Sequence, residues 1–118
     1  MSRHQRYRDE AEARYPTLSQ FLGGYLHEDW PEMHGTPEAA VDKAISEYPI
    51  ELRRVVRKEL ADLLMRTEDD TQLRSLLNTG LGVNVYFKKP AESRAFAQEV
   101  ERKLLSSIQT YFDQQRRS

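Results

Sequence analysis

The sequence predicts an all-α fold, a compact single-domain bundle of about five helices with one short extended segment near residues 82–88. Apolar residues recur every three or four positions over most of the chain, which is the spacing of a buried helix face. Only residues 82–88 alternate as a strand does, and no second strand is predicted to pair with them. With 118 residues and no cysteine, the chain can bury one core and must do so without disulfides.

Residues 1–14 are polar and of mixed charge, so we expect a polar tail or a frayed helix there, before a folded domain over residues 15–118. The tail has no apolar stretch of the kind that secretory signals contain. No apolar run in the chain approaches the ~20 residues of a membrane helix. These features predict a soluble, cytoplasmic protein that does not contact a membrane.

The first strong helix is predicted to begin after Thr17, which can cap it, and to continue to Leu26. Gly23 and Gly24 lie within it, and each costs about 1 kcal/mol relative to alanine. We interpret this pair as a bend or a close approach of another helix, rather than as backbone access for a ligand. The buried stripe of this helix is Leu18, Phe21, Leu22, Tyr25 and Leu26.

Pro31 is expected to end this segment, and Gly35 to mark a turn. The run Thr36, Pro37, Glu38 then predicts a helix start, because it offers a hydroxyl cap, a proline in the first turn and an acid near the helix dipole. The next proline along the chain ends this second helix. Its buried stripe is Val41, Ala44, Ile45 and Tyr48.

A third helix is predicted over residues 50–65, and a fourth follows it. Thr67 and Asp70 resemble a capping pair for the fourth helix, and Gly80 or Gly82 ends it. The apolar residues of the third helix are Leu52, Val55, Val56, Leu60, Leu63 and Leu64. Those of the fourth are Leu73, Leu76 and Leu77.

Residues 82–88 follow, as an extended connector or as an edge offered to a partner; we favour the connector. The last and longest helix is predicted to begin near Pro90 or Ala91. Its apolar residues recur every four positions: Phe96, Val100, Leu104, Ile108 and Phe112.

Charge is distributed unevenly, although the net charge is only −1. Residues 28–47 hold six acidic residues against Lys43, a local charge of −5, and residues 51–58 hold four basic residues against Glu51, a local charge of +3. An acidic surface repels nucleic acid and attracts basic proteins. The only tryptophan lies in the acidic segment, as a plug of the bundle or as an interface residue. We predict a partner-binding site of Glu28, Asp29, Trp30, Glu32 and Asp42.

A small metal-dependent hydrolase is one alternative function, centred on His27, Asp29 and His34. Their spacing matches no helical metal motif such as H-E-x-x-H. The sequence also lacks a nucleophile elbow, a phosphate-binding glycine loop and a dinucleotide fingerprint. We therefore predict no catalytic residues, no cofactor and no bound metal.

A nucleic-acid-binding helical domain is the other alternative. It would use four basic residues that repeat one helical turn apart, with two lysines near the start of the last helix. The acidic segment beside them in sequence argues against it. The six residues are Arg53, Arg54, Arg57, Lys58, Lys88 and Lys89.

The run from Tyr15 to Ile45 resembles the signature half of the CdiI family, the immunity proteins of contact-dependent growth inhibition. That family shows an aromatic-proline start, a Q-F-L-G-x-Y segment, a histidine and an acid before tryptophan, a Gly-Thr/Ser-Pro-Glu loop and then A-V-D. A weaker resemblance extends to about residue 105, although Lys88-Lys89-Pro90 stands where the family tends to be aromatic and acidic. The matching residues are Tyr15, Pro16, Leu18, Phe21, Leu22, Gly23, Tyr25, His27, Asp29, Trp30, Gly35, Pro37, Glu38, Ala40, Val41, Asp42 and Ile45.

The resemblance implies a non-enzymatic immunity protein in the cytoplasm of a toxin-bearing bacterium. Such a protein binds and neutralises the C-terminal toxin domain of a large exported effector, often a nuclease. We expect a monomer that forms a 1:1 complex with its toxin, and no contact with nucleic acid. An acidic patch suits the basic cleft of a nuclease. In a competing interpretation the shared residues hold the fold, and other, variable residues contact the toxin.

Overall fold

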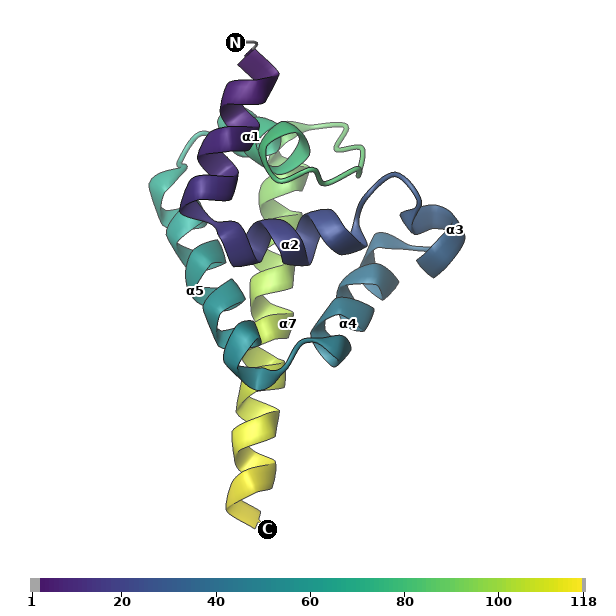
Figure 1. The fold of residues 1–118 in the computed structure, drawn as a ribbon, viewed down its shortest axis with the longest axis vertical. Coiled ribbons are helices and arrows are strands. Elements are labelled where there is room, and N and C mark those ends of the chain that lie inside the picture. Colours follow the sequence, from purple (N-terminus) through teal and green to yellow (C-terminus); the bar gives the residue numbers. More distant parts are fainter. Residues whose placement is uncertain (1–2, 118) are drawn as a thin grey trace.

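The computed structural model describes residues 3–117, which form helices joined by short connections (Figure 1). In chain order these are α1 (Arg3–Arg14), α2 (Pro16–Tyr25), α3 (Trp30–His34), α4 (Pro37–Glu47), α5 (Ile50–Arg66), α6 (Asp70–Ser75), the π-helical turn η1 (Leu76–Gly80) and α7 (Pro90–Arg117). No strand occurs among the described residues. The predicted all-α domain is therefore confirmed, with seven α-helices over residues 3–117 rather than about five.

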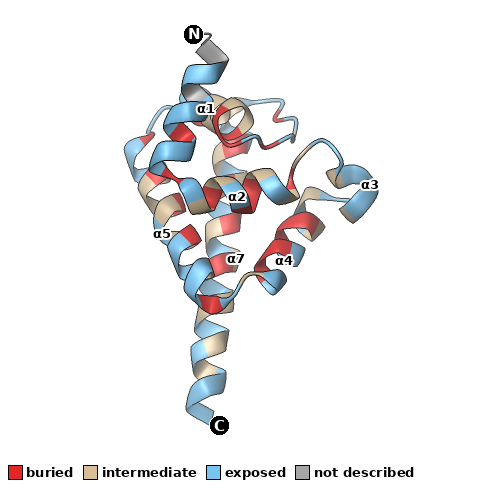
Figure 2. Cartoon of the chain, viewed as in Figure 1, coloured by how far each residue is buried: buried red, intermediate tan, exposed pale blue. Residues whose placement is uncertain are grey.

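The longest helix, α7, is the axis on which the other helices pack (Figure 1). Helix α5 lies antiparallel beside it, because Arg53 near the start of α5 contacts Ser107, while Thr67 just after α5 contacts Arg94. Buried residues gather where α2, α4 and α5 face α7 (Figure 2). The fully buried side chains of this core include Leu18, Phe21, Leu22, Val56, Leu60, Leu63 and Leu104.

Two residues predicted for the apolar side of α5 are exposed. Leu52 and Val55 lie on the surface, whereas Val56, Leu60 and Leu63 are buried. Helix α5 packs mainly between α2 and α7. Its buried face is a narrow stripe of positions four and three residues apart, and the neighbouring apolar positions point past both partners.

The N-terminus of α2 is capped differently from the prediction. Thr17 lies inside α2, whose N-cap is Tyr15 and makes no side-chain capping bond. Instead, the backbone N–H of Leu18 donates to Oε1 of Glu59 on α5 at 2.8 Å. A carboxylate from a neighbouring helix thus satisfies a donor that α2 cannot satisfy itself.

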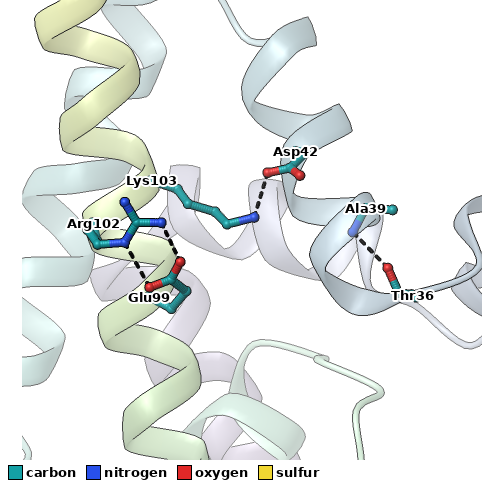
Figure 3. A network of polar contacts seen from close by, with 6 residues as sticks. All are labelled: Thr36, Ala39, Asp42, Glu99, Arg102 and Lys103. Carbon is teal, nitrogen blue, oxygen red and sulfur yellow. Dashed lines mark hydrogen bonds and ion pairs between the residues drawn. The ribbon is translucent and has the colours of Figure 1, made fainter.

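Of the two other N-caps that were predicted, the cap of α4 is correct and the cap of α6 is wrong. Thr36 caps α4 as predicted, because its Oγ1 accepts from the N–H of Ala39 at 3.1 Å (Figure 3). Helix α6 is capped by Asp69, whose Oδ1 accepts from the N–H of Gln72 at 2.9 Å, and not by Thr67, which ends α5. An aspartate carboxylate caps a helix at least as well as a threonine hydroxyl, but Asp69 was not among the predicted caps.

Pro31 does not end the first strong helix, as was predicted, but lies inside the short helix that follows it. Helix α2 already ends at Tyr25, and Pro31 is the second residue of the short helix α3, where its missing N–H has no bond to lose. Gly35, with φ of 84°, then ends α3 and makes the turn that was predicted for it.

Residues 82–88 form an extended connector without a strand partner. Its polar backbone groups are satisfied in other ways. Nδ2 of Asn78 in η1 donates to the carbonyl oxygens of Val83 and Val85, at 2.8 and 3.0 Å. The N–H of Asn84 donates to the carbonyl of Leu26 at 2.7 Å. These bonds hold the connector against α2 and η1.

The predicted close approach is found at Gly23. A Cβ there would lie 2.7 Å from the carbonyl oxygen of Leu81, at the end of η1, so only glycine fits without a shift. Nothing lies within 4 Å of a Cβ at Gly24. The glycine pair therefore has a packing reason at one position only.

Residues Arg3–Arg14 of the expected N-terminal tail form α1, which buries Ala11 and packs against η1 and α2. The first two residues of that tail lie outside the described residues. Among residues 3–117, no helix combines the length and the apolar character needed to cross a membrane.

Candidate functional site

Three of the predicted site residues lie together at the edge of the molecule. Glu28 and Asp29 occupy the connection from α2 to α3, and Glu32 lies in the first turn of α3. All three are exposed. Helix α3 stands at one side of the bundle, beside the start of α4 (Figure 1). We name Glu28, Asp29 and Glu32 the acidic turn.

The local backbone leaves the carboxylates of the acidic turn facing solvent. The N–H of Asp29 donates to Nδ1 of His27 at 3.1 Å. Asp29 is the N-cap of α3, yet its side chain makes no capping bond and is 66% exposed. Its Oδ2 lies 3.9 Å from the same His27 nitrogen. Within the described part of the chain, no lysine or arginine forms an ion pair with the acidic turn, so its negative charge faces solvent.

Trp30 connects the acidic turn to the rest of the fold. Its indole Nε1 donates to the carbonyl oxygen of Asn84 at 2.6 Å. The ring is half-buried and packs against the core. The indole thus fixes α3 to the connector through its polar end, as buried tryptophans commonly do, and leaves part of its ring at the surface.

Asp42 lies apart from the acidic turn, on α4, and its carboxylate is directed at α7. Nζ of Lys103 reaches across from α7 and donates to Oδ1 of Asp42 at 2.7 Å (Figure 3). The Lys103 side chain is 20% exposed and that of Asp42 63% exposed. The predicted site is therefore split: the structure groups three acids in one turn and pairs the fourth with a lysine.

The three residues of the alternative metal site are not arranged as ligands. The ring of His34 lies beside Tyr25, with centroids 6.2 Å apart, while His27 is bonded to the N–H of Asp29. Within the described part of the chain, no three or more histidine, aspartate or glutamate side chains are placed to hold a metal.

Two basic residues of the alternative nucleic-acid site, Arg53 and Arg54, make contacts within the protein. Nε of Arg53 donates to the carbonyl oxygen of Tyr48 at 2.9 Å, and its guanidinium lies 6.0 Å from the ring centroid of Tyr111. The guanidinium of Arg54 lies 5.5 Å from the ring centroid of Phe112. The two ring contacts fasten α5 to the C-terminal half of α7, and the bond to Tyr48 fastens it to the end of α4.

The two lysines of the same hypothesis lie elsewhere. Lys88 and Lys89 precede α7, whereas Arg53 contacts Ser107 far along that helix. At 1.5 Å per residue, the two positions are about 25 Å apart. The six basic residues therefore do not form one continuous patch.

The structure also has a groove that the sequence did not predict. It has a volume of about 320 Å³ and lies between the start of α4, the connector and α7. We name it the α4–α7 groove. Its walls come from three segments far apart in the chain, and periodicity does not reveal which helices leave a gap. The one sequence signal was the apolar face of residues 83–87, which an all-α fold leaves without an obvious partner.

Comparison with known proteins identifies the family. The sequence pattern of the CdiI immunity protein family matches residues 14–104, which is close to the range of the resemblance seen in the sequence. Comparisons with curated proteins and with solved structures found no significant match. The matched range runs from the end of α1 to the middle of α7 and includes the acidic turn, Trp30 and the α4–α7 groove. The chain therefore belongs to the CdiI immunity protein family.

Proposed function

We propose that this protein binds the C-terminal toxin domain of a cognate contact-dependent growth inhibition effector and blocks it by occupying its surface. The family match over residues 14–104 is the observation that supports this function most directly. The protein would act in the cytoplasm of the producing bacterium, as a monomer in a 1:1 complex. It would inhibit stoichiometrically, without transforming a substrate.

The proposed contact surface is centred on the acidic turn. Its three carboxylates are exposed and close together, and Trp30 beside them offers a half-buried ring of the kind that anchors protein interfaces. Asp42 contributes less in this proposal, because Lys103 already engages its carboxylate.

The proposed target is a nuclease toxin. A nuclease needs a basic cleft to hold phosphates, and a cluster of carboxylates is complementary to such a cleft. Complementary charge raises the association rate and disfavours partners of the wrong charge, which suits an inhibitor that must capture its toxin quickly.

The test uses the toxin domain encoded immediately upstream of this gene, co-expressed and purified with this protein. The wild-type protein is expected to co-purify with the toxin and to abolish its nuclease activity at equimolar ratio. If the toxin stays fully active in excess of this protein, the proposed function is wrong.

The contact surface is tested by the triple variant Glu28→Lys, Asp29→Lys, Glu32→Lys. Its association rate is expected to fall about 10- to 1,000-fold at low salt. The matched control, Glu12→Lys, Glu51→Lys, Glu68→Lys, changes the net charge equally at exposed positions outside the turn. Equal association rates for the two triple variants would reject the acidic turn while leaving the proposed function intact.

A further inference from the structure

We propose that the α4–α7 groove receives an apolar side chain of the toxin domain, carried on a segment that has lysine or arginine beside it. The inference rests on the proposed function and specifies the chemistry of the partner at a second contact next to the acidic turn. It makes the groove the anchor of the complex and the acidic turn the element that steers the toxin toward it.

The floor of the groove is apolar and belongs to the core. Val41, Phe87 and Val100 are buried beneath it, and Val85 and Phe96 are half-buried in its walls. The rings of Phe87 and Phe96 lie 5.4 Å apart. A side chain entering here would exchange water for carbon at the floor and lower walls, which favours an aliphatic or aromatic group.

The size of the groove limits its occupant. Its volume of about 320 Å³ lies at the lower end of the range of roughly 300–1,000 Å³ for small-molecule sites. It therefore has room for one or two large side chains and not for a whole helix. A single anchoring residue in a desolvated pocket is the common arrangement at the centre of protein interfaces.

The charged residues at the rim define what flanks that anchor. Glu38, Glu92 and Glu99 line the groove against a single cation, Lys103, so the lining carries a net charge of −2. Lys103 is already held by Asp42 on α4 (Figure 3). An apolar anchor flanked by basic residues is therefore complementary to this rim, and one flanked by acids would be repelled.

Two of the three rim glutamates, Glu92 and Glu99, are fixed in place. Oε1 of Glu92 accepts from the backbone N–H of Lys88 at 3.0 Å. Oε2 of Glu99 accepts from Nε of Arg102 at 2.9 Å, and this hydrogen bond lowers the pKa of Glu99 (Figure 3). Both carboxylates thus stand at the rim in a defined position. Arg102 pairs with Glu99 as Lys103 does with Asp42, so Glu38 and Glu92 supply most of the negative charge that the rim offers a partner.

The groove continues the proposed contact surface. Trp30 of α3 is bonded to the carbonyl of Asn84, and the next residue, Val85, lines the groove. Pro37 and Glu38, which begin α4 just after α3, line it from the other side. One partner surface can therefore cover both the acidic turn and the groove.

A larger hollow elsewhere lacks this complementarity. It has a volume of about 640 Å³ and lies between α1, α5 and η1. Arg14 and Arg66 line it against Glu10 alone, so its lining is positively charged. It would repel the basic surface of a nuclease, so we assign the anchor to the α4–α7 groove.

The decisive variant is Ala95→Trp, which places an indole over the groove from an exposed position in its wall. The dissociation constant for the toxin domain is expected to rise about 30-fold or more, the effect of losing one anchoring residue. The control is Gln98→Trp, an exposed residue of the same helix that does not line the groove, and it should stay within about threefold of wild type. Thermal unfolding followed by circular dichroism verifies that both variants fold.

The rim is tested by Glu38→Lys against Glu51→Lys. Both glutamates are exposed and lie in the first turn of a helix, so both reversals lose the same interaction with a helix dipole. Of these two glutamates, only Glu38 lines the groove. We expect the Glu38 variant to weaken toxin binding about tenfold more than the Glu51 variant.

The groove can also be tested in the wild-type protein, by nuclear magnetic resonance. Methyl resonances of Val41, Val85 and Val100 are expected to shift when toxin is added, because all three line the groove. If the toxin is bound and inhibited while these resonances stay unchanged and Ala95→Trp binds like wild type, the groove proposal is wrong and the proposed function stands. If the wild-type protein does not bind toxin at all, both are wrong. Shifts that instead follow the protein's own concentration, without toxin, would assign the groove to a second copy and overturn the proposal.

Discussion

The two halves of α7 follow the same sequence pattern but have different surroundings. In residues 90–104, Ser93, Ala97, Val100 and Leu104 are buried against the other helices. In residues 105–117, no residue is buried, and the helix projects beyond the bundle (Figure 2). The family match ends at residue 104, the last buried position. An apolar stripe thus predicts a helix and its preferred face, but whether that face is covered depends on the length of the helices beside it.

The largest expected difference between the two halves comes from adjacent leucines. Leu104 is 0% exposed and Leu105 45% exposed. Leu104→Ala should lower the free energy of unfolding by about 2–5 kcal/mol, because it leaves a cavity in the core. Leu105→Ala should change it by less than about 0.5 kcal/mol. Urea unfolding measures both values, and similar losses for the two variants would contradict the contrast.

Arginines provide the next comparison. Arg94, in the buried half, donates to Asp70 and to the carbonyl of Thr67, which is itself buried. Arg116, in the projecting half, pairs with Asp113 at the surface. Arg94→Ala should destabilise the fold by about 1.5–3 kcal/mol, and Arg116→Ala by less than about 0.5 kcal/mol. If Arg116→Ala destabilises the fold as much as Arg94→Ala does, the ion pair of Arg116 orders the projecting half of α7.

Tyr15, at the N-terminal end of the range that matches the family, should make the stability of the fold depend on pH. Burial, together with a 2.8 Å hydrogen bond to Oδ2 of Asp62, raises the pKa of Tyr15 from its ordinary value of 10.0 to about 12. The stability that the neutral phenol contributes is therefore complete below pH 10 and is lost as the pH rises through about 12. Tyr15→Phe should cost about 1–2 kcal/mol at neutral pH through the lost bond.

The same variant should lose less stability than wild type when the pH is raised into this alkaline range. The measurement is the free energy of unfolding of both proteins at neutral pH and at two alkaline pH values. Parallel pH profiles for wild type and Tyr15→Phe would mean that another group causes the alkaline loss.

The smallest loss of stability is expected from removing the end of the projecting half, residues 110–118. A chain that ends at Gln109 lacks Tyr111 and Phe112, and so the contacts of Arg53 and Arg54 with these rings. Each such contact is worth about 0.5–1 kcal/mol at an exposed site. The shortened protein should remain folded, lose about 1–2 kcal/mol at most, and still bind toxin. Loss of toxin binding with an intact fold would place part of the toxin contact on residues 110–117, outside the groove that the buried half of α7 lines.

The sequence predicted the positions of the helices better than the contacts between them. Periodic leucines, the proline of α4 and Thr36 located most helices, and the family resemblance over residues 15–105 agrees with the match over residues 14–104. The cap of α2 could not be predicted, because Glu59 lies 41 residues away in sequence from Leu18. Such long-range partners are set by tertiary packing and leave no local signature.

The candidate site was predicted in part for the same reason. The exposure of the acidic turn follows from its local sequence, whereas the partner of Asp42 lies on α7, 61 residues later. The α4–α7 groove likewise depends on three segments that meet only in the folded chain. Chemistry that is local in sequence was predictable, and chemistry created by assembly was not.

The single tryptophan has a practical consequence. Trp30 lies half-buried beside the acidic turn, with its N–H bonded to Asn84. Its fluorescence therefore comes from one known place in the molecule, and the wavelength of its emission depends on how much water surrounds the ring. The wild-type protein carries its own optical reporter, so that capture of a partner lacking tryptophan can be followed in real time without attaching a dye.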